Sequence, residues 1–312
     1  MLVGRGIKSS GLSKSNHNVL NWLLLLALAL IWGTSYILIK KGLIAFTPVE
    51  LACLRLSISF VASVPFAIKA LSAIPRDKFS AVFLIGFFGN GIPAFLFALS
   101  LTKSGSAVTG ILNSLSPLWT LLVGIYFFKV VVSRQKVSGV IVGFMGAMVL
   151  VLGKRGENFQ TDALYSLLPV AATLCYGISS NIMKEKMQTG NPIYVTSLAL
   201  MTVGLPSLIG LFFTSAPAKI IGGQVWPSFA CIAILSLFGT LIAWMLFYRL
   251  VQRTDALFAA SVTYLAPIVA IGWGLLDGEV LNFLQLLGML LILTGVYFTT
   301  SGKTMRIAGQ TS

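Results

Sequence analysis

Long apolar runs separated by short polar segments dominate the chain. Ten of these runs are about 20 residues long, which is the length that an α-helix needs to cross the hydrocarbon core of a bilayer. They occupy residues 20–41, 49–70, 79–102, 105–128, 135–153, 163–187, 192–214, 227–250, 255–276 and 281–301. The runs are continuous rather than alternating, so the pattern predicts membrane-spanning helices and not the strands of a barrel.

The second half of the chain repeats the first. Counterparts 144 residues apart are Trp32 and Tyr176, Lys40 and Lys184, and Pro48 and Pro192. Counterparts 150 residues apart are Gly89 and Gly239, Phe97 and Phe247, and Pro117 and Pro267. An internal repeat of this length decides the architecture. We divide the chain into an N-terminal tail (1–19), a first repeat (20–155), a second repeat (160–302) and a C-terminal tail (303–312).

Each repeat holds five predicted spans. Because five is odd, the first helix of the second repeat enters the membrane from the side opposite to the first helix of the first repeat. The expected fold is therefore all-α: a polytopic membrane protein with ten transmembrane helices in a five-plus-five inverted, antiparallel repeat. Inverted repeats recur in transporters, which hold their substrate between the repeats near the bilayer midplane.

Composition supports a membrane protein. Hydrophobic residues make up 57% of the chain and charged residues only 10%, whereas soluble domains have about 25% charged residues. The mean hydropathy is +0.93. The first apolar run ends in Lys40-Lys41 rather than at a small-residue cleavage site, so we expect a retained span and not a signal peptide.

The net charge of +14 is distributed as membrane topology requires. Fifteen of the 22 Lys and Arg residues fall on the side that holds both tails, six fall on the opposite side, and Arg55 lies within a span. Short cytoplasmic loops carry this excess, so both termini are expected in the cytoplasm, and the location is expected to be a bacterial inner (plasma) membrane. The basic residues then meet lipid headgroups, and we expect no nucleic-acid partner.

Several short motifs resemble a known family. They are Ile31-Trp32-Gly33-Thr34-Ser35, Leu54-Arg55-Leu56, Ser116-Pro117, and Gly278-Glu279 followed by Gln285 and Gly288. Together they resemble the EamA family of the drug/metabolite transporter superfamily, over residues 20–302. The resemblance implies a ten-helix carrier of small organic molecules, often exporting amino acids or related metabolites, with the fifth and tenth helices peripheral. The first half departs from the pattern, because Phe128-Lys129-Val130-Val131 lacks the acidic residue of the Gly-Glu pair.

Polar and aromatic side chains recur at helical spacing within the spans, where such groups are functional candidates. The stripes come from six helices that the repeat relates in pairs, so they can converge on one cavity. The predicted substrate-binding residues are Trp32, Ser35, Tyr36, Lys40, Asn90, Asn113, Tyr176, Ser180, Lys184, Trp244, Tyr248 and Tyr264.

Structural explanations compete with these assignments. Serines such as Ser35 occur at helix–helix contacts, and Lys40 and Lys184 lie near span ends from which they can reach water. Pro117 and Pro267 each free a backbone carbonyl inside a span, which predicts a hinge or a simple kink.

No Asp, Glu or His lies centrally in a predicted span, so we expect facilitated transport rather than proton antiport. The sequence has no phosphate-binding loop and no metal-ligand spacing, so no cofactor, no metal and no enzymatic activity are expected. A duplicated chain makes a monomer sufficient and leaves a dimer open.

The leading hypothesis is a carrier that exports amino acids or related metabolites. The alternative is a carrier for phosphorylated or nucleotide-linked solutes that uses Lys40 and Lys184 as anion ligands. A membrane-embedded enzyme or lipid scramblase is disfavoured, because the spans lack paired Asp residues and Ser/His or His/Glu constellations.

Overall fold

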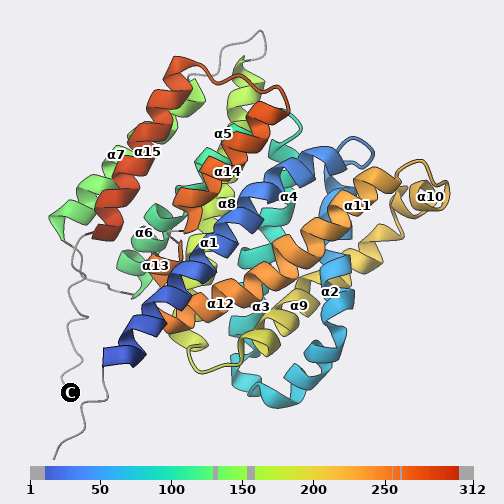
Figure 1. Ribbon diagram of the computed structural model, residues 1–312. Helices are drawn as coiled ribbons and strands as arrows, with labels where there is room; N and C mark the ends of the chain where they lie inside the picture. Colours follow the sequence, from blue (N-terminus) through green and yellow to red (C-terminus); the bar gives the residue numbers. More distant parts are fainter. Residues whose placement is uncertain (1–10, 129–132, 153–158, 255, 261, 302–312) are drawn as a thin grey trace, which may run out of the picture.

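Helices account for nearly all of the computed structural model, which describes residues 11–128, 133–152, 159–254, 256–260 and 262–301 (Figure 1). No strand is present in that part of the chain. The helices of the first half are α1 (Gly11–Gly42), α2 (Pro48–Ala73), α3 (Phe79–Gly86), α4 (Ile92–Ser100), α5 (Ser106–Asn113), α6 (Ser116–Phe128) and α7 (Arg134–Leu152). A 3₁₀ turn η1 (Arg76–Lys78) precedes α3, and a π-helical segment η2 (Phe87–Gly91) joins α3 to α4.

The second half repeats this order. Its helices are α8 (Phe159–Lys186), α9 (Pro192–Leu211), α10 (Ala216–Ile221), α11 (Trp226–Ile234), α12 (Ala243–Arg253), α13 (Ala256–Ala260), α14 (Val262–Leu276) and α15 (Phe283–Ser301). A π-helical segment η3 (Leu235–Ile242) joins α11 to α12, as η2 joins α3 to α4. Wide π-helical turns of this kind are frequent at functional sites.

Eight helical stretches are long and apolar enough to cross a membrane. They are Val19–Gly42, Pro48–Ala73, Arg76–Ser100, Ser106–Phe128, Leu164–Lys186, Pro192–Leu211, Trp226–Arg253 and Phe258–Leu276, and Phe283–Gly295 is a shorter apolar helix. All-helical polytopic architecture is thus confirmed, whereas the full count of ten spans stays a prediction. Two details differ from the sequence expectation: α1 begins at Gly11, within the predicted tail, and α10 lies where a loop was expected. Hydropathy marks the membrane-embedded length and cannot detect helical turns outside it.

The same cap starts corresponding helices in the two halves. Thr47 caps α2 by accepting the Glu50 amide at 3.2 Å, while the Glu50 carboxylate accepts the Thr47 amide at 2.8 Å. Asn191 caps α9 by accepting the Ile193 amide at 2.9 Å. A proline follows each cap, at the first helical position, where a missing N–H has no consequence.

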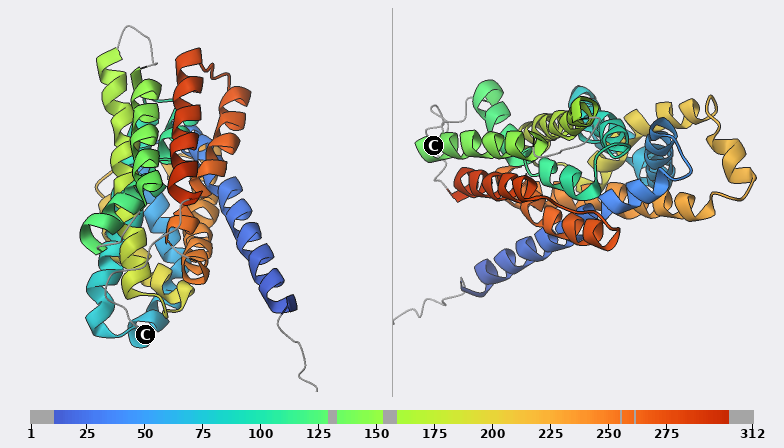
Figure 2. Two further views of the ribbon diagram at one scale, coloured as in Figure 1. Left: turned by 90° about the vertical axis from the view of Figure 1, so that its left-hand side faces the viewer. Right: turned by 90° about the horizontal axis from the view of Figure 1, so that it is seen from above.

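Helix contacts between the halves come in exchanged pairs. The helix α2 packs on α9, and α7 packs on α15. The helices α7 and α15 lie side by side at one edge of the bundle (Figures 1 and 2). The helix α1 contacts α14, α11 and α12, while α8 contacts α6, α3 and α4. The exchange agrees with a duplicated chain, and the inverted membrane orientation of the two repeats stays a prediction.

Two glycines allow the exchanged helices to approach. A Cβ at Gly239 would lie 2.7 Å from Ser35 Oγ, and a Cβ at Gly89 would lie 2.6 Å from Ser179 Oγ. Both distances are shorter than real Cβ contacts, so a side chain at either glycine would displace the serine hydroxyl where α1 or α8 crosses the π-helical segment.

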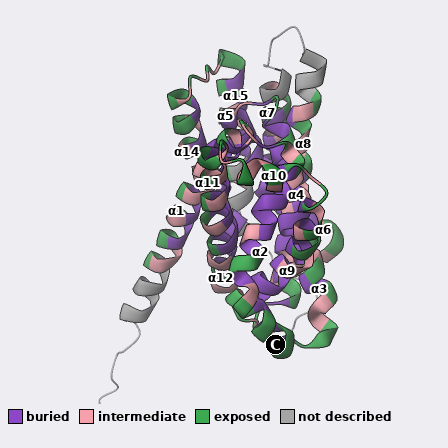
Figure 3. Ribbon diagram, turned by 90° about the vertical axis from the view of Figure 1, so that its right-hand side faces the viewer, coloured by how far each residue is buried: buried purple, intermediate pink, exposed green. Residues whose placement is uncertain are grey.

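Large apolar side chains cover much of the outer surface. Leu30, Ile209 and Leu290 expose 59%, 55% and 58% of their surface, whereas buried residues concentrate in the middle of the bundle (Figure 3). An exposed apolar surface of this extent would be unfavourable in water, and it suits contact with lipid chains.

The contact between α7 and α15 gives a direct test of the packing. A Cβ at Gly295 would lie 2.3 Å from the Gly143 backbone nitrogen and 2.5 Å from the Gly139 carbonyl oxygen. We expect Gly295→Ala to lower the melting temperature of the detergent-solubilised protein by several degrees, since overpacking costs roughly 1–3 kcal/mol.

The matched control is Gly272→Ala in α14, where a Cβ would meet nothing within 4 Å. This variant should keep or slightly raise the melting temperature, because alanine favours a helix over glycine. Equal behaviour of the two variants would contradict the close packing of α7 against α15.

Candidate functional site

A cavity lies between helices from both halves of the chain. Its walls come from α1, α2, α4, α5 and α6 of the first half and from α8, α12, α13 and α14 of the second. It contains about 580 Å³ of space free of protein atoms, part of which is open to solvent. The lining residues are Trp32, Ser35, Tyr36, Arg55, Phe97, Asn113, Ser116, Thr120, Tyr176, Ser180, Trp244, Phe247, Ala260 and Thr263.

Six aromatic rings form a connected wall of this cavity, which we call the aromatic wall: Trp32, Tyr36, Phe97, Tyr176, Trp244 and Phe247. Successive ring centroids are 5.2–6.2 Å apart. Such spacing is typical of favourable ring pairs. The wall therefore offers a large, rigid apolar surface to a bound molecule.

Arg55 is the one charged side chain among the described residues that line the cavity. It is only 7% exposed, and its Nε donates to Thr240 Oγ1 at 2.7 Å. Thr240 belongs to η3, so the π-helical segment supplies the hydrogen-bond acceptor that holds the guanidinium. Arg55 thus finds its hydrogen-bond partner on another helical segment rather than on α2.

Hydroxyl and amide groups line the side of the cavity formed by α5 and α6. Ser116 Oγ donates to the Asn113 carbonyl, and Thr120 Oγ1 donates to the Ser116 carbonyl, both at 2.8 Å. Each hydroxyl thus uses its proton on a backbone carbonyl three or four residues earlier in the chain and keeps lone pairs that can accept from a ligand.

Seven of the twelve predicted substrate-binding residues line the cavity: Trp32, Ser35, Tyr36, Asn113, Tyr176, Ser180 and Trp244. Four others, Lys40, Asn90, Lys184 and Tyr248, lie elsewhere. The side chain of Tyr264 lies outside the described residues. The predicted list left out the other seven lining residues, although Arg55 carried a signal as the one cation deep within a span: Arg55, Phe97, Ser116, Thr120, Phe247, Ala260 and Thr263.

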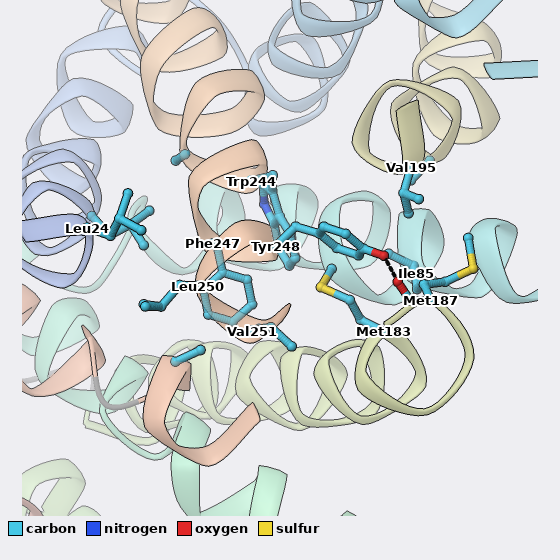
Figure 4. Packing of buried hydrophobic residues seen from close by; sticks show 14 of the residues in the cluster. Leu24, Ile85, Met183, Met187, Val195, Trp244, Phe247, Tyr248, Leu250 and Val251 are labelled. Carbon is cyan, nitrogen blue, oxygen red and sulfur yellow. Dashed lines mark hydrogen bonds between the residues drawn. The ribbon is translucent and has the colours of Figure 1, made fainter. Parts of the chain in front are cut away.

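Tyr248 and Asn90 are buried away from the cavity. Tyr248 directs its hydroxyl to the Met187 carbonyl at the end of α8 (Figure 4), while Phe247 takes the cavity-facing position on the same turn. Asn90 is 5% exposed, and its Oδ1 has no hydrogen-bond partner within the described chain. Helical spacing alone cannot distinguish neighbouring positions such as 247 and 248.

Lys40 belongs to an ion-pair cluster that we call the Lys40 cluster: Lys40, Lys41, Asp277 and Glu279. Lys40 Nζ lies 2.7 Å from Asp277 and 2.8 Å from Glu279, and Lys41 Nζ lies 2.5 Å from Asp277. The cluster joins the end of α1 to the segment that follows α14.

Glu279 also binds the start of α5. Its carboxylate accepts the backbone amides of Ser106 at 2.9 Å and Ala107 at 3.1 Å, and the Ser106 hydroxyl at 2.8 Å. The Glu of the Gly-Glu motif therefore ties three helices together at one end of the bundle. The counterpart segment of the first half, residues 129–132, lies outside the described residues.

Lys184 binds backbone rather than carboxylate. Its Nζ donates to the Thr254 carbonyl at 2.9 Å and to the Val251 carbonyl at 3.4 Å, at the carboxyl end of α12, where cations are favourable. Because neither Lys40 nor Lys184 lines the cavity, the structure gives no support to their role as ligands of a phosphorylated substrate.

The two predicted hinge prolines occupy different settings. Pro117 lies in the first turn of α6, and Pro267 lies inside α14. The ring of Pro267 removes the N–H that would bind the Thr263 carbonyl, and Ser114 Oγ donates to this carbonyl at 2.8 Å instead. This hydrogen bond from α5–α6 to α14 compensates for the proline, and the hinge role stays a prediction.

Both carboxyl groups of the Lys40 cluster titrate below their usual range. The hydrogen bonds from Lys40 and Lys41 lower the pKa of Asp277. Burial raises the pKa of Glu279, but the hydrogen bonds from Lys40, the two amides and Ser106 outweigh burial, so its pKa is lowered. Both carboxyl groups are therefore ionised at neutral pH.

Comparison with known proteins identifies the family of this chain. The family model described as "EamA-like transporter family" matches the chain twice, over residues 20–152 and 163–301. The chain belongs to the EamA-like transporter family. The resemblance found in the motifs is thus confirmed, and the protein is a transporter rather than an enzyme.

Relatives within this family span the chain almost completely. A "Probable amino-acid metabolite efflux pump" of Salmonella typhimurium is 24% identical and aligns with 92% of this chain and 98% of its own. The protein of the same description from Escherichia coli K12 is 24% identical, over 91% and 96%. An "Uncharacterized transporter" of Archaeoglobus fulgidus is 24% identical, over 88% and 97%.

A solved crystal structure shares the fold, with a TM-score of 0.63 and 19% identity over 89% of this chain and 96% of that one. No group of three His, Cys, Asp or Glu side chains that could hold a metal is found in the part of this EamA transporter that the structure describes.

The Lys40 cluster predicts a pH dependence of stability. The folded-state pKa of Glu279 is lower than the unfolded-state value of roughly 4.3. The ionised Glu279 therefore contributes its full share to the free energy of unfolding when the pH is above its unfolded-state pKa. This stabilisation is lost as the pH falls through the lowered folded-state pKa. At pH 7 we expect Glu279→Gln to lower the melting temperature by a few degrees, and below a pH of about 4 we expect this difference to shrink.

Glu185→Gln is the control, because Glu185 is exposed on the last turn of α8. It should leave the melting temperature unchanged at both pH values. A difference between wild type and Glu279→Gln that stays constant as the pH falls would show that the ionised carboxylate is not what stabilises this end of the bundle.

Proposed function

We propose that this EamA transporter exports amino acids or related small organic metabolites through the central cavity. One observation carries the proposal: the cavity lies between the two halves and combines an aromatic wall with polar groups and a single fixed charge. Trp32 and Tyr176 lie near the middle of their spans, Val19–Gly42 and Leu164–Lys186. A ligand in contact with both is therefore about half-way across the membrane.

The relatives support the same class of cargo. Two of them are described as probable amino-acid metabolite efflux pumps. At 24% identity their substrates need not be those of this chain, so amino-acid export is the proposal and not a transfer from the relatives. The phosphorylated-solute alternative has no observation in its favour, because its two lysines are engaged outside the cavity.

Alternating access is the proposed mechanism. The helix contacts exchanged between the halves support two repeats related by a twofold axis, and such repeats can exchange conformations around a fixed midplane site. The Lys40 cluster joins α1, α5 and the end of α14, so opening the cavity toward that end requires these ion pairs to separate.

The expected topology gives the direction. With both termini in the cytoplasm of a bacterium, the Lys40 cluster lies at the outer face of the inner membrane, and the conformation described is closed outward. No Asp, Glu or His lines the cavity in the described part of the chain, which favours facilitated transport over proton antiport. The duplicated chain supplies both repeats, so a monomer is sufficient.

Filling the cavity tests the proposal. Ser180 lines it and is 2% exposed, so Ser180→Trp should occupy the space that a substrate needs. In proteoliposomes loaded with radiolabelled amino acids, we expect the efflux rate of the variant to be at least roughly tenfold lower than that of the wild type. The reason is that a site blocked by an indole cannot bind its ligand.

The matched control places the same side chain on the lipid-facing surface. Ile209 is 55% exposed, and Ile209→Trp should keep wild-type efflux. Undiminished efflux through folded Ser180→Trp would exclude the cavity as the pathway. Efflux that requires an imposed pH gradient in fixed stoichiometry would leave the pathway intact but contradict facilitated transport.

A further inference from the structure

We propose that Arg55 binds the carboxylate of a small monoanionic acid and that the aromatic wall holds the apolar body of this acid. The inference rests on the proposed function, since it takes the central cavity as the transport site. It goes further by naming the chemistry that the cavity selects: one negative charge is required, and an amino group is not.

The charge of Arg55 lacks a counter-ion within the described chain. A guanidinium stays protonated in proteins, and buried charges are normally paired. Glu50 lies 2.7 Å from Lys219, and Asp277 and Glu279 belong to the Lys40 cluster. The two remaining carboxylates whose side chains the structure describes, Asp77 and Glu185, are exposed outside the cavity. A bound anion would supply the counter-ion that the described part of the protein does not provide.

The guanidinium is held in a fixed orientation. Its Nε donates to Thr240 Oγ1 at 2.7 Å, and within the described chain its Nη1 and Nη2 atoms have no hydrogen-bond partner. The backbone is fixed as well, because Ser59 Oγ bridges the Arg55 carbonyl at 2.7 Å and the Ser236 carbonyl at 2.9 Å. The two free Nη groups form the fork that binds a carboxylate through two parallel hydrogen bonds.

The repeat provides this charge only once. The offset of 144 residues places Ala199 at the position equivalent to Arg55, and the offset of 150 places Asn90 at the position equivalent to Thr240. The counterpart pair, Ala199 of the second half and Asn90 of the first, therefore has neither the cation nor the hydroxyl. Asn90 Oδ1 is buried without a hydrogen-bond partner in the described residues. One fixed positive charge favours a monocarboxylate over a dicarboxylate.

The surroundings of Arg55 favour an acid without an ammonium group. The described lining residues include no carboxylate that could pair with an ammonium, and the positive charge of Arg55 repels it. Aromatic faces attract cations by only about 0.5–2 kcal/mol, and desolvating an ammonium costs several kcal/mol. Binding a monoanion leaves the occupied cavity electrically neutral, which is the state that crosses a low-dielectric region most readily.

A matched series of ligands tests this inference by isothermal titration calorimetry on the full chain in detergent. The probes are 3-phenylpropanoate, phenylalanine, 2-phenylethylamine and phenylsuccinate, which differ in carboxylates and amino group around one apolar body. We expect 3-phenylpropanoate to bind at least as tightly as phenylalanine. The amine and the dicarboxylate should each bind at least roughly tenfold more weakly than the monoacid, given the unpaired charge that each brings.

Variants locate the binding group. Arg55→Gln should weaken binding of 3-phenylpropanoate at least roughly tenfold, and Arg55→Lys should weaken it less, because a lysine keeps the charge without the fork. Thr240→Val should also weaken it, by releasing the guanidinium. Ser57→Ala is the control: Ser57 is buried in α2, does not line the cavity, and its Oγ has no partner in the described chain.

The outcomes separate this inference from the proposed function. Unchanged affinity of folded Arg55→Gln for the acid, tighter binding of 2-phenylethylamine than of the acid, a dependence on the amino group, or no binding by any probe would each overturn the inference. Amino-acid efflux by the wild type would then still support the proposed function. If Ser180→Trp binds the acid as tightly as the wild type does, the cavity is not the site, and both proposals fall. If Arg55→Gln does not fold, the ligand series on the wild type decides alone.

Discussion

A charged guanidinium at the centre of a membrane helix costs on the order of 2.5–3.5 kcal/mol on insertion scales. Arg55 is the eighth residue of the 26-residue span Pro48–Ala73, and its environment offsets the cost of its burial only in part. Thr240 satisfies one donor of the side chain, and the phenol and indole rings around the cavity supply polarisable surface. The other donors face the cavity. Because Arg55 lines the cavity, an anion bound there would satisfy donors that the protein leaves free.

Among the side chains that the structure describes, carboxylates and lysines lie apart from that space. The Lys40 cluster and the Glu50–Lys219 pair both lie at helix ends, where water solvates whatever the partners leave unsatisfied. If an acidic side chain pointed into the cavity, it would pair with Arg55 and exclude an anionic ligand. The distribution of charge thus gives the two regions different roles: the ends hold helices together, and the centre remains free to bind.

Much of the helical architecture could be predicted because hydrocarbon length and hydropathy constrain each span separately. The π-helical segments could not, since no local pattern distinguishes Leu235–Ile242 from an α-helix. In the site, helical spacing placed Trp32, Ser35 and Tyr36 on one face of α1, and all three line the cavity, while their contact with substrate stays a prediction. Lys40 lies on the same face but one turn closer to the end of α1, where it forms ion pairs with Asp277 and Glu279. Arg55 could be noticed but not placed, because its partner Thr240 is 185 residues away in the chain.

The most direct measurement is a crystal structure of the protein with 3-(4-iodophenyl)propanoate, in which anomalous scattering locates the iodine independently of the model phases. We predict an iodine peak against the aromatic wall and a carboxylate within hydrogen-bonding distance, roughly 2.7–3.2 Å, of the Arg55 Nη atoms. A ligand bound at the Lys40 cluster or on the lipid-facing surface, with the central cavity unoccupied, would contradict the assignment of the cavity as the transport site.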